Sequence, residues 1–392
     1  MTFCILEQSK LTLKKMNILS RLASKQIEKY LFKGKVLIIY GPRQVGKTTL
    51  VKRLMEQYSG RYLLCEEPDI ATALTGKTST ELWHFLGENK LIILDEAQKV
   101  ENIGTVLKLL VDTKPEIQIV ATGSSSFELA NKVNEPLTGR NFEVHMYPLT
   151  VSEIVNNSSL LEAKRLLEPL LIYGSYPEIF LNTDLKVDLL KKITNDYLYK
   201  DILSFGDIRK PSLLRDILRA LALQVGSQVS YSELASLVGA SRATVQSYID
   251  ILEKAFILFK LYPLSSRKRN EIRHMHKIYF YDNGFLNTLL QNYNALALRG
   301  DTGALFENFF ISEKMKQKAA TDTLGDVYFW RSKSGQEVDF VESFEGGTRL
   351  VAYECKWAKP KAKLPSQFQA TYKVSEFKVI TKDNVIEELS RA

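Results

Sequence analysis

The stretch that decides the fold is VLIIY-GPRQVGKTT, residues 36–49. Residues 36–40 form a short apolar run, which is typical of a buried β-strand. Residues 41–49 match the pattern GxxxxGK[ST] without a deviation, and the residues TTLVKRLMEQ (48–57) predict a helix directly behind it. A strand, this motif and a helix in that order are the context that a phosphate-binding loop requires.

The chemistry of phosphate binding explains the residue types of this loop. Its glycines let backbone N–H groups turn toward phosphate oxygens, and the start of the helix adds the positive end of a dipole. Lys47 would neutralise charge on the β- and γ-phosphates, and the Thr48 hydroxyl is a Mg²⁺ ligand. We therefore predict that ATP and Mg²⁺ bind here, with nucleotide contacts from Gly41, Pro42, Arg43, Gln44, Val45, Gly46, Lys47, Thr48 and Thr49.

A second apolar run, LIILDE (91–96), ends in two carboxylates. An acidic pair after a strand can be an ordinary solvated loop. Behind a phosphate-binding loop, however, it lies at the edge of an α/β sheet where ligands bind. Asp95 is predicted to hold Mg²⁺ through water, and Glu96 to orient or deprotonate the attacking water as a catalytic residue.

Further candidates lie at the end of the next predicted strand, IQIVATG (117–123), and beyond it. Ser124 or Thr122 could contact the γ-phosphate or the water, and the alternative is a serine-rich turn that caps the next helix. Arg140 could act as an arginine finger, in the same chain or across the interface of a homo-oligomer. It could also be a surface arginine, and Arg43 is a rival for the role.

The absence of one motif indicates which nucleotide base the loop binds. No Asn-Lys-x-Asp sequence, which reads guanine, occurs in the chain. ATP is therefore favoured over GTP.

The pattern along the chain predicts an α/β fold in several parts. Short apolar runs separated by helices up to about residue 150 indicate a parallel sheet covered on both faces. The chain then becomes mostly helical, and it returns to mixed α and β after about residue 300. The predicted divisions are an N-terminal extension (1–16), a P-loop ATPase domain (17–150), a helical lid or connector (151–205), a winged-helix domain (206–285) and a C-terminal α/β domain (286–392).

Composition excludes several classes of protein. The chain has 392 residues, of which 45% are hydrophobic and 25% charged, with 20 Gly and 11 Pro, so it is neither disordered nor collagenous. Three cysteines without a CxxC pair give no disulfide framework or zinc site and favour a reducing, cytoplasmic location. No apolar run predicts a membrane span, and no signal peptide is recognised. The net charge of +8 permits a polyanionic partner without requiring one.

A helix-turn-helix pattern lies between residues 230 and 254. Ser230 opens a short helix, and Ser241 opens a longer one whose polar face includes Arg242 and Gln246. A strand, a basic segment and another strand (KIYFYD, 277–282) follow, as in a basic wing that extends to Lys277. The pattern favours contact with DNA through Arg242, Gln246, Arg267, Lys268 and Arg269. A module that binds protein is the equally open alternative.

The last predicted domain holds carboxylates and a lysine at suggestive spacing. Asp339 lies in one predicted strand, and Glu354 and Lys356 share a face of the next. A hairpin would bring them together, and Glu307 on a preceding helix could join them. Such groups could hold Mg²⁺ and activate water, whereas the alternative is an ordinary amphipathic hairpin.

Taken in order, the motifs resemble one prokaryotic family. GPRQVGKTTL, LIILDEAQ, ATGSSS, LTGR, YGSYPE (173–178) and GQEVDFV…YECKW are similar to those of AAA-like (AAA_14) ATPases that carry a C-terminal DUF4143 region. The resemblance implies a P-loop ATPase domain, a winged helix and a domain similar to PD-(D/E)xK nucleases. The nuclease-type signature then falls on Glu307, Asp339, Glu354 and Lys356, with Glu307, Asp339 and Glu354 as metal ligands and Asp339, Glu354 and Lys356 as catalytic residues.

These expectations define two functions. The first is an ATP-hydrolysing protein that acts on or with DNA, with metal-dependent nuclease activity left open. The second is a nucleotide-switched regulatory or protein-interaction module whose nuclease-like domain is catalytically inactive.

Overall fold

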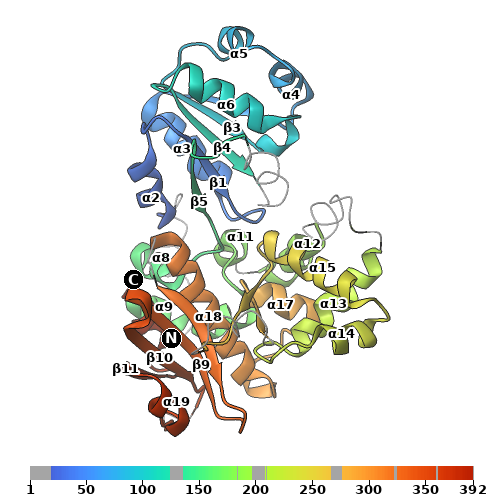
Figure 1. Cartoon of the computed structure of the whole chain (residues 1–392), viewed down its shortest axis with the longest axis vertical. Helices are drawn as coiled ribbons and strands as arrows, with labels where there is room; N and C mark the ends of the chain where they lie inside the picture. The colour runs from blue at the N-terminus through green and yellow to red at the C-terminus, as the bar shows by residue number, and fades with distance from the viewer. Residues whose placement is uncertain are drawn as a thin grey trace.

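The computed structural model describes residues 19–123, 136–182, 184–196, 208, 210–265, 276–321, 325–358 and 361–391. Figure 1 shows an upper lobe formed by the first part of the chain and a lower body formed by the rest. Helix α8 and the strand that precedes it lie where the two meet. Within the described residues, none of the helices combines the length and the apolar character that crossing a bilayer requires.

The upper lobe is built on a five-stranded sheet of order β2-β3-β4-β1-β5, and every neighbouring pair is parallel. Its strands are β1 (Val36–Tyr40), β2 (Arg61–Leu64), β3 (Leu91–Asp95), β4 (Gln118–Gly123) and β5 (Asn141–His145). The helices are α2 (Ala23–Tyr30), α3 (Lys47–Tyr58), α4 (Pro68–Leu74), α5 (Ser79–Leu86) and α6 (Ile103–Thr113). The predicted α/β fold with a parallel P-loop sheet is confirmed.

Both faces of this sheet are covered, because alternate residues of each strand join different apolar clusters. Ile38 and Ile92 pack with residues of α4, α5 and α6. Leu37 and Ile93 pack on the other face with residues of α2 and α3. All five residues of β1 and of β3 are therefore buried, which accounts for their near-continuous apolar sequence.

The lower body begins with short helices. These are α8 (Val151–Asn157), α9 (Leu160–Arg165), α10 (Leu167–Tyr173), α11 (Pro177–Leu181) and α12 (Lys186–Asp196). A helical unit with an antiparallel hairpin follows: α13 (Pro211–Leu223), α14 (Tyr231–Val238), α15 (Arg242–Lys254), β6 (Leu258–Leu261), β7 (Lys277–Phe280) and α17 (Asn283–Leu290). Ser230 and Ser241 cap α14 and α15 by accepting from the backbone N–H groups of Glu233 and Thr244.

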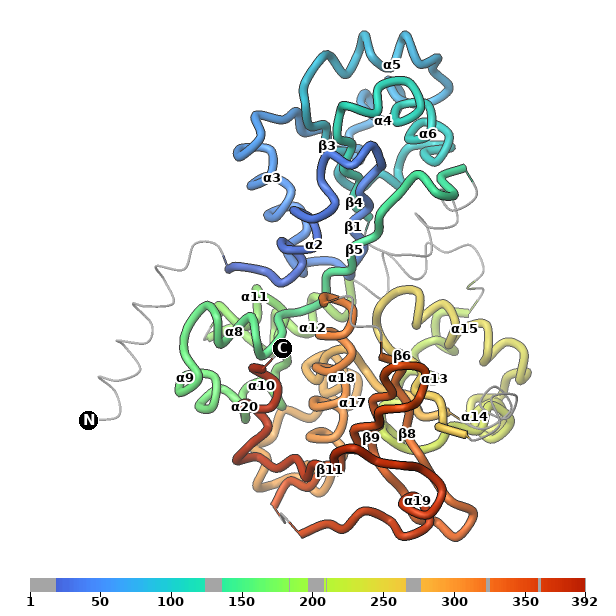
Figure 2. The backbone as a smooth tube through the Cα atoms, turned by 60° about the vertical axis from the view of Figure 1, so that its left-hand side comes forward, coloured from blue at the N-terminus to red at the C-terminus, as the bar shows by residue number. Residues whose placement is uncertain are grey.

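The C-terminal part is a long helix and a four-stranded sheet of order β11-β10-β9-β8. Strands β8, β9 and β10 pair antiparallel, whereas β11 runs parallel to β10. The elements are α18 (Thr302–Thr321), β8 (Asp326–Arg331), β9 (Glu337–Phe344), β10 (Arg349–Cys355), α19 (Ser366–Thr371), β11 (Val374–Ile380) and α20 (Val385–Ser390). In Figure 2, α18 lies between this sheet and the helices of the connector.

The lower body shares one large apolar core. A single buried cluster extends from Leu149 through residues of α13, α15 and α18 to Leu389. An isolated bridge between Pro263 and Phe329 also joins the hairpin unit to the C-terminal sheet. The predicted division of this region at residues 205 and 285 stays a prediction, but its parts pack as one body.

Candidate functional site

The phosphate-binding loop turns between β1 and α3. A β-carbon on Gly41 would lie 2.1 Å from the carbonyl oxygen of Met146, so only glycine fits at the start of the loop. Gly46 has φ of +98°, which favours glycine directly before the helix. Lys47 is buried, and its Nζ donates to the carbonyl oxygens of Gly41 (2.7 Å) and Pro42 (2.9 Å). Its ammonium group is thus held across the mouth of the loop.

Asp95 lies at the carboxyl end of β3 and meets three hydroxyl groups. Its Oδ2 accepts from Thr48 Oγ1 at 2.8 Å and from the Tyr62 hydroxyl at 2.6 Å, while its Oδ1 accepts from Thr122 Oγ1. The structure therefore brings together Thr48 and Asp95, the two residues predicted to serve Mg²⁺. A hydroxyl and a buried carboxylate at the mouth of a phosphate loop are oxygen donors of the kind that Mg²⁺ prefers, so these residues fit the ion.

Glu96 occupies a left-handed backbone conformation with φ of 54°. Its N–H donates to Thr122 Oγ1 at 3.0 Å, and its Oε2 accepts from Gln98 Nε2 at 2.5 Å. These two contacts hold a carboxylate next to the Mg²⁺ pair. The position is suited to orienting a water molecule.

Tyr62 was not among the residues predicted from the sequence. Its strand, β2, pairs with β3 so that Leu64 lies opposite Asp95. Burial, followed by the hydrogen bond with Asp95, raises the pKa of the Tyr62 hydroxyl well above its ordinary value. Tyr62 therefore remains a neutral donor to Asp95 at physiological pH. In the sequence, Tyr62 is only the first residue of another short apolar run, YLLCE (62–66), so no local pattern identifies it as a site residue.

Of the two candidates Thr122 and Ser124, the structure describes only Thr122, which lies near the end of β4. Thr122 is fully buried and joins Asp95 to the backbone of Glu96. Its hydrogen bonds to Asp95 and to the Glu96 N–H hold the two acidic residues in place. Ser124 lies outside the described residues, so its predicted role stays a prediction.

The prediction that Arg140 reaches a phosphate in its own chain is corrected. Arg140 directly precedes β5, whose first residue pairs with Val36 at the start of β1. The phosphate loop follows the other end of β1, about 16 Å away at roughly 3.3 Å per residue. The Arg140 side chain instead pairs with Asp112, with Nε 2.7 Å from Oδ1. A role across an oligomer interface stays a prediction, and Arg43 is the arginine that lies in the loop.

The predicted DNA-contacting face is only partly described. Arg242 and Gln246 are exposed on the first two turns of α15. A pocket beside them, between α13 and the α14–α15 turn, is lined by residues that include Lys210, Ser241 and Thr244, together with Asp216. Arg267, Lys268 and Arg269 lie outside the described residues. The prediction that the basic wing extends to Lys277 is corrected, because Lys277 is buried and is not part of an exposed wing.

The predicted carboxylate–lysine group does assemble in the C-terminal part. Strands β9 and β10 form the expected hairpin, in which Phe340 pairs with Tyr353. Asp339 Oδ2 accepts from the Cys355 N–H at 2.8 Å. Burial, and then the nearby charges of Glu307 and Glu354, raise the pKa of Asp339 well above its usual range. Lys356 Nζ lies 2.7 Å from Glu354 Oε1.

Lys277 adds a cation that the sequence did not place here. From β7, its Nζ contacts Glu337 Oε1 and lies 3.2 Å from Glu307 Oε1, which also accepts from the Tyr279 hydroxyl at 2.7 Å. The Lys277 side chain is 1% exposed. Burial lowers its pKa, but Glu307, Glu337 and Asp339 raise it by more, so Lys277 stays charged. We call Lys277, Glu307, Glu337 and Asp339 the lysine–carboxylate cluster.

The lysine–carboxylate cluster does not fit a divalent metal as it stands. An ammonium group already contacts two of its carboxylates. Among the described residues, no three His, Cys, Asp or Glu side chains are placed to hold a metal ion together. Of the three predicted metal ligands, Glu307 is the one that Lys277 contacts, and joint ligation of a metal by Glu307, Asp339 and Glu354 stays a prediction.

Models of three protein families match successive parts of the chain. Residues 33–155 match the family model AAA_14, described as an AAA domain. Residues 164–295 match DUF8612 and residues 302–390 match DUF4143, both described as domains of unknown function.

Related chains cover most of this one. A Mycobacterium tuberculosis protein described as uncharacterized is 28% identical over 348 residues, which is 87% of this chain and 74% of that protein. A Methanocaldococcus jannaschii protein with the same description is 24% identical over 82% of this chain and 75% of its own length. A solved structure of the Aeropyrum pernix ORC1 protein in complex with DNA aligns with 70% of this chain and 93% of that chain, at 13% identity and a TM-score of 0.32.

Proposed function

We propose that this chain, whose residues 33–155 match the AAA domain model and whose residues 302–390 match DUF4143, binds ATP with Mg²⁺ at residues 41–49 and hydrolyses it. The observation that carries this proposal is the meeting of Thr48, Asp95 and Glu96 at the mouth of the loop. Phosphoryl transfer needs charge neutralisation and a positioned water more than covalent chemistry. The described residues supply both kinds of group.

Each residue has a defined task in this proposal. Lys47 exchanges its two carbonyl partners for phosphate oxygens when nucleotide enters. Thr48 and Asp95 would hold Mg²⁺, which supplies charge neutralisation to the phosphates. Glu96 accepts a proton from, or orients, the attacking water, while Thr122 fixes the backbone of Glu96.

Exchanging Glu96 for glutamine is expected to separate binding from turnover. The amide keeps the size of the side chain but is no longer a base, so turnover should fall by about 100-fold or more while ATP stays bound. Phosphate release and the nucleotide retained after gel filtration measure the two effects. Glu101→Gln, an exposed neighbour, is the matched control. Unchanged turnover in Glu96→Gln would remove Glu96 from the proposed chemistry.

We propose DNA as the partner of the helical unit. Arg242 and Gln246 are exposed at the start of α15, and the adjoining pocket presents Lys210 and the hydroxyl groups of Ser241 and Thr244. Cationic and hydroxyl groups at a helix start are the groups that contact phosphates and base edges in helix-turn-helix proteins. These observations support a winged-helix unit that docks on DNA.

Binding of duplex DNA is expected to weaken at least tenfold between about 50 and 200 mM salt. Arg242→Ala should weaken it further and reduce the salt slope by about one. Fluorescence anisotropy of a labelled duplex measures both, with Arg53→Ala, an exposed arginine of the ATPase domain, as the control. Phosphate release with and without the same duplex reports whether DNA stimulates the ATPase. Absence of salt-dependent binding would instead favour the protein-interaction function.

A second function, a nuclease-like domain that does not cleave, is favoured by one observation. Lys277 holds the charge balance of the lysine–carboxylate cluster from a strand outside the C-terminal sheet. We propose that the C-terminal part acts as a binding or regulatory module, with its carboxylates engaged in packing against β7.

A further inference from the structure

Arg21 joins three parts of the chain at the phosphate loop. Its Nη1 donates to the carbonyl oxygen of Val45, its Nη2 to that of Tyr147 at 2.6 Å, and its Nε to Glu153 Oε1 at 3.0 Å. The Arg21 side chain is 8% exposed and that of Glu153 is 4% exposed. A buried guanidinium with three fixed acceptors has one defined position.

The backbone around Arg21 is anchored on helix α8. The N–H of Leu22 donates to Glu153 Oε1 at 2.7 Å, and Ser20 exchanges hydrogen bonds with the side chain of Asn157. Both partners belong to α8, in the lower body. The tip of Arg21, however, contacts Val45 in the upper lobe, so this side chain crosses from one part to the other.

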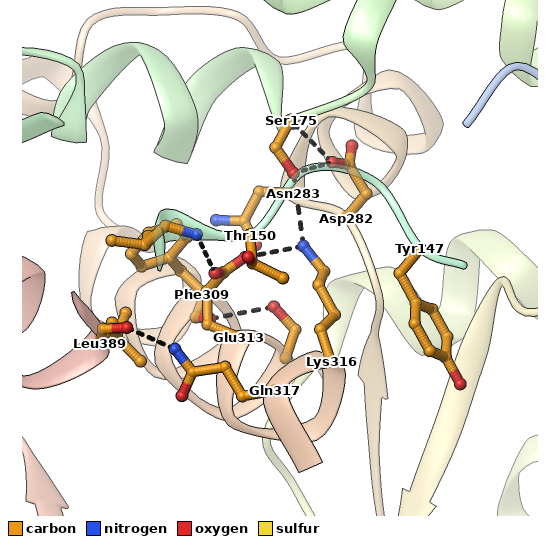
Figure 3. Close-up of polar contacts among 12 residues, drawn as sticks. Tyr147, Thr150, Ser175, Asp282, Asn283, Phe309, Glu313, Lys316, Gln317 and Leu389 are labelled. Atoms are coloured by element: carbon orange, nitrogen blue, oxygen red, sulfur yellow. Dashed lines mark hydrogen bonds and ion pairs between the residues drawn. The ribbon is translucent and has the colours of Figure 1, made fainter. Parts of the chain in front are cut away.

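From α8, polar contacts continue into the long helix α18. Glu153 also accepts from the Thr150 N–H at 3.0 Å, and the next N–H, of Val151, donates to Glu313 Oε2 at 2.6 Å. Figure 3 shows the Glu313–Lys316 pair at this junction, with Thr150 and Ser175 beside it. Lys316 Nζ lies 2.8 Å from Glu313 Oε1 and donates to Ser175 Oγ at 3.3 Å.

The same junction reaches helix α17. The N–H of Ser175 donates to Asp282 Oδ2 at 2.7 Å, and Asp282 caps α17 by accepting from Phe285. Glu313, Lys316, Ser175 and Asp282 are all buried. Because buried charged groups lose much energy when they separate, this junction moves as a unit or stays in place.

We propose that Arg21 is a positioning residue for the phosphate loop, and that through Glu153 and Glu313 it couples nucleotide binding to helix α18. This inference rests on the proposed ATP function. The Val45 carbonyl is fixed from behind the loop, so the N–H groups of the loop are already oriented when phosphates arrive. Any change in the loop on binding then acts on α8 and α18 through the same guanidinium.

Arg21→Ala is expected to raise both KM for ATP and the dissociation constant of a fluorescent ATP analogue about tenfold, as for loss of a charged hydrogen bond. The value of kcat should change by no more than about twofold, because the oriented N–H groups of the phosphate loop bind the substrate and the transition state alike. Arg53→Ala, an exposed arginine on α3, is the matched control and should change neither constant.

Coupling is tested by hydrogen exchange of backbone amides in α8 and α18, with saturating ATP and without it. Wild type should show about tenfold slower exchange near Val151 and Glu313 when ATP is bound, whereas Arg21→Ala should show no ATP-dependent change. A purely structural role would accelerate exchange equally in both conditions. Arg21→Lys keeps the charge but not the three-way geometry, so it should also lose the ATP-dependent change. It replaces Arg21→Ala in this test if the alanine variant fails to fold.

Two outcomes overturn the inference. One is wild type that binds and hydrolyses ATP without any change in α18 exchange. The other is an Arg21 variant that retains the full ATP-dependent change. Failure of the ATP function itself is recognised separately, because wild type would then bind no fluorescent analogue.

Discussion

Lys47→Ala is expected to abolish ATP turnover, with phosphate release falling at least about 100-fold. The Lys47 ammonium is the buried cation at the mouth of the phosphate loop, and alanine leaves charge on the phosphates without its neutralising partner. ATP affinity should fall as well, in contrast to Glu96→Gln, which retains ATP. Phosphate release at saturating Mg²⁺ and ATP measures the effect.

A matched lysine controls for general damage to the fold. Lys108 is exposed on α6, so Lys108→Ala should keep wild-type turnover. Lys47→Arg keeps a cation but enlarges a buried group, and it should also lose most turnover if a compact ammonium is required. Turnover in Lys47→Ala comparable to wild type would show that hydrolysis comes from another site or from a contaminant.

Lys277→Met is expected to cost about 3–5 kcal/mol of unfolding free energy at neutral pH. Methionine is similar in length, but it leaves the buried Asp339 carboxylate and the half-buried carboxylates of Glu307 and Glu337 without their cation. Chemical denaturation measures the loss. Lys356→Met is the control: the Lys356 side chain is 42% exposed, so the pair that it forms with Glu354 should contribute no more than about 1 kcal/mol.

Acid is expected to restore part of the stability of Lys277→Met. The groups that face the missing cation are Glu307 on α18, Glu337 and Asp339 on β9, with Glu354, Lys356 and Arg331 near them. The pKa of Asp339 is already raised in the fold, so its ionised form opposes folding. The contribution of Asp339 to the free energy of unfolding is fully present when the carboxyl is protonated in both the folded and the unfolded chain. That contribution is lost as the pH rises through the folded pKa of Asp339. The variant should therefore lose less stability relative to wild type at about pH 5 than at pH 7.5.

Divalent cations test the same cluster without reference to stability. Calorimetry with Mn²⁺ alone should show no uptake that depends on Asp339 in the wild type, and plasmid DNA should not be nicked. Mn²⁺ binding or nicking by wild type that disappears in Asp339→Ala would contradict the non-cleaving function. A Lys277→Met variant as stable as wild type would contradict the charge balance assigned to Lys277.

The P-loop domain could be predicted in detail because its signals are local. The strands β1, β3 and β4 are apolar runs, and the motif residues Lys47, Thr48 and Asp95 follow strand ends that parallel pairing brings to one edge. The position of Arg140 could also be deduced from the topology of the parallel sheet. A residue that precedes a parallel strand lies at the opposite edge from one that follows it, so Arg140 and the phosphate loop could not meet in one chain.

Other residues depended on packing that no local pattern records. Tyr62 meets Asp95 only because β2 pairs with β3 in a particular register. Lys277 resembled the end of a basic wing, but the lower body shares one core, and packing of β7 against α18 buries Lys277 among carboxylates. Arg21 was not predicted either, since its three acceptors come from residues 45, 147 and 153.

Phosphate release by the purified wild-type chain in Mg²⁺ and ATP, with Lys47→Ala prepared and measured in parallel, tests the proposed ATP site most directly. We expect Mg²⁺-dependent release by wild type, which chelation of the metal stops and which Lys47→Ala reduces to background. No release by wild type, or equal release by the two proteins, would contradict the claim that residues 41–49 form a working ATP site.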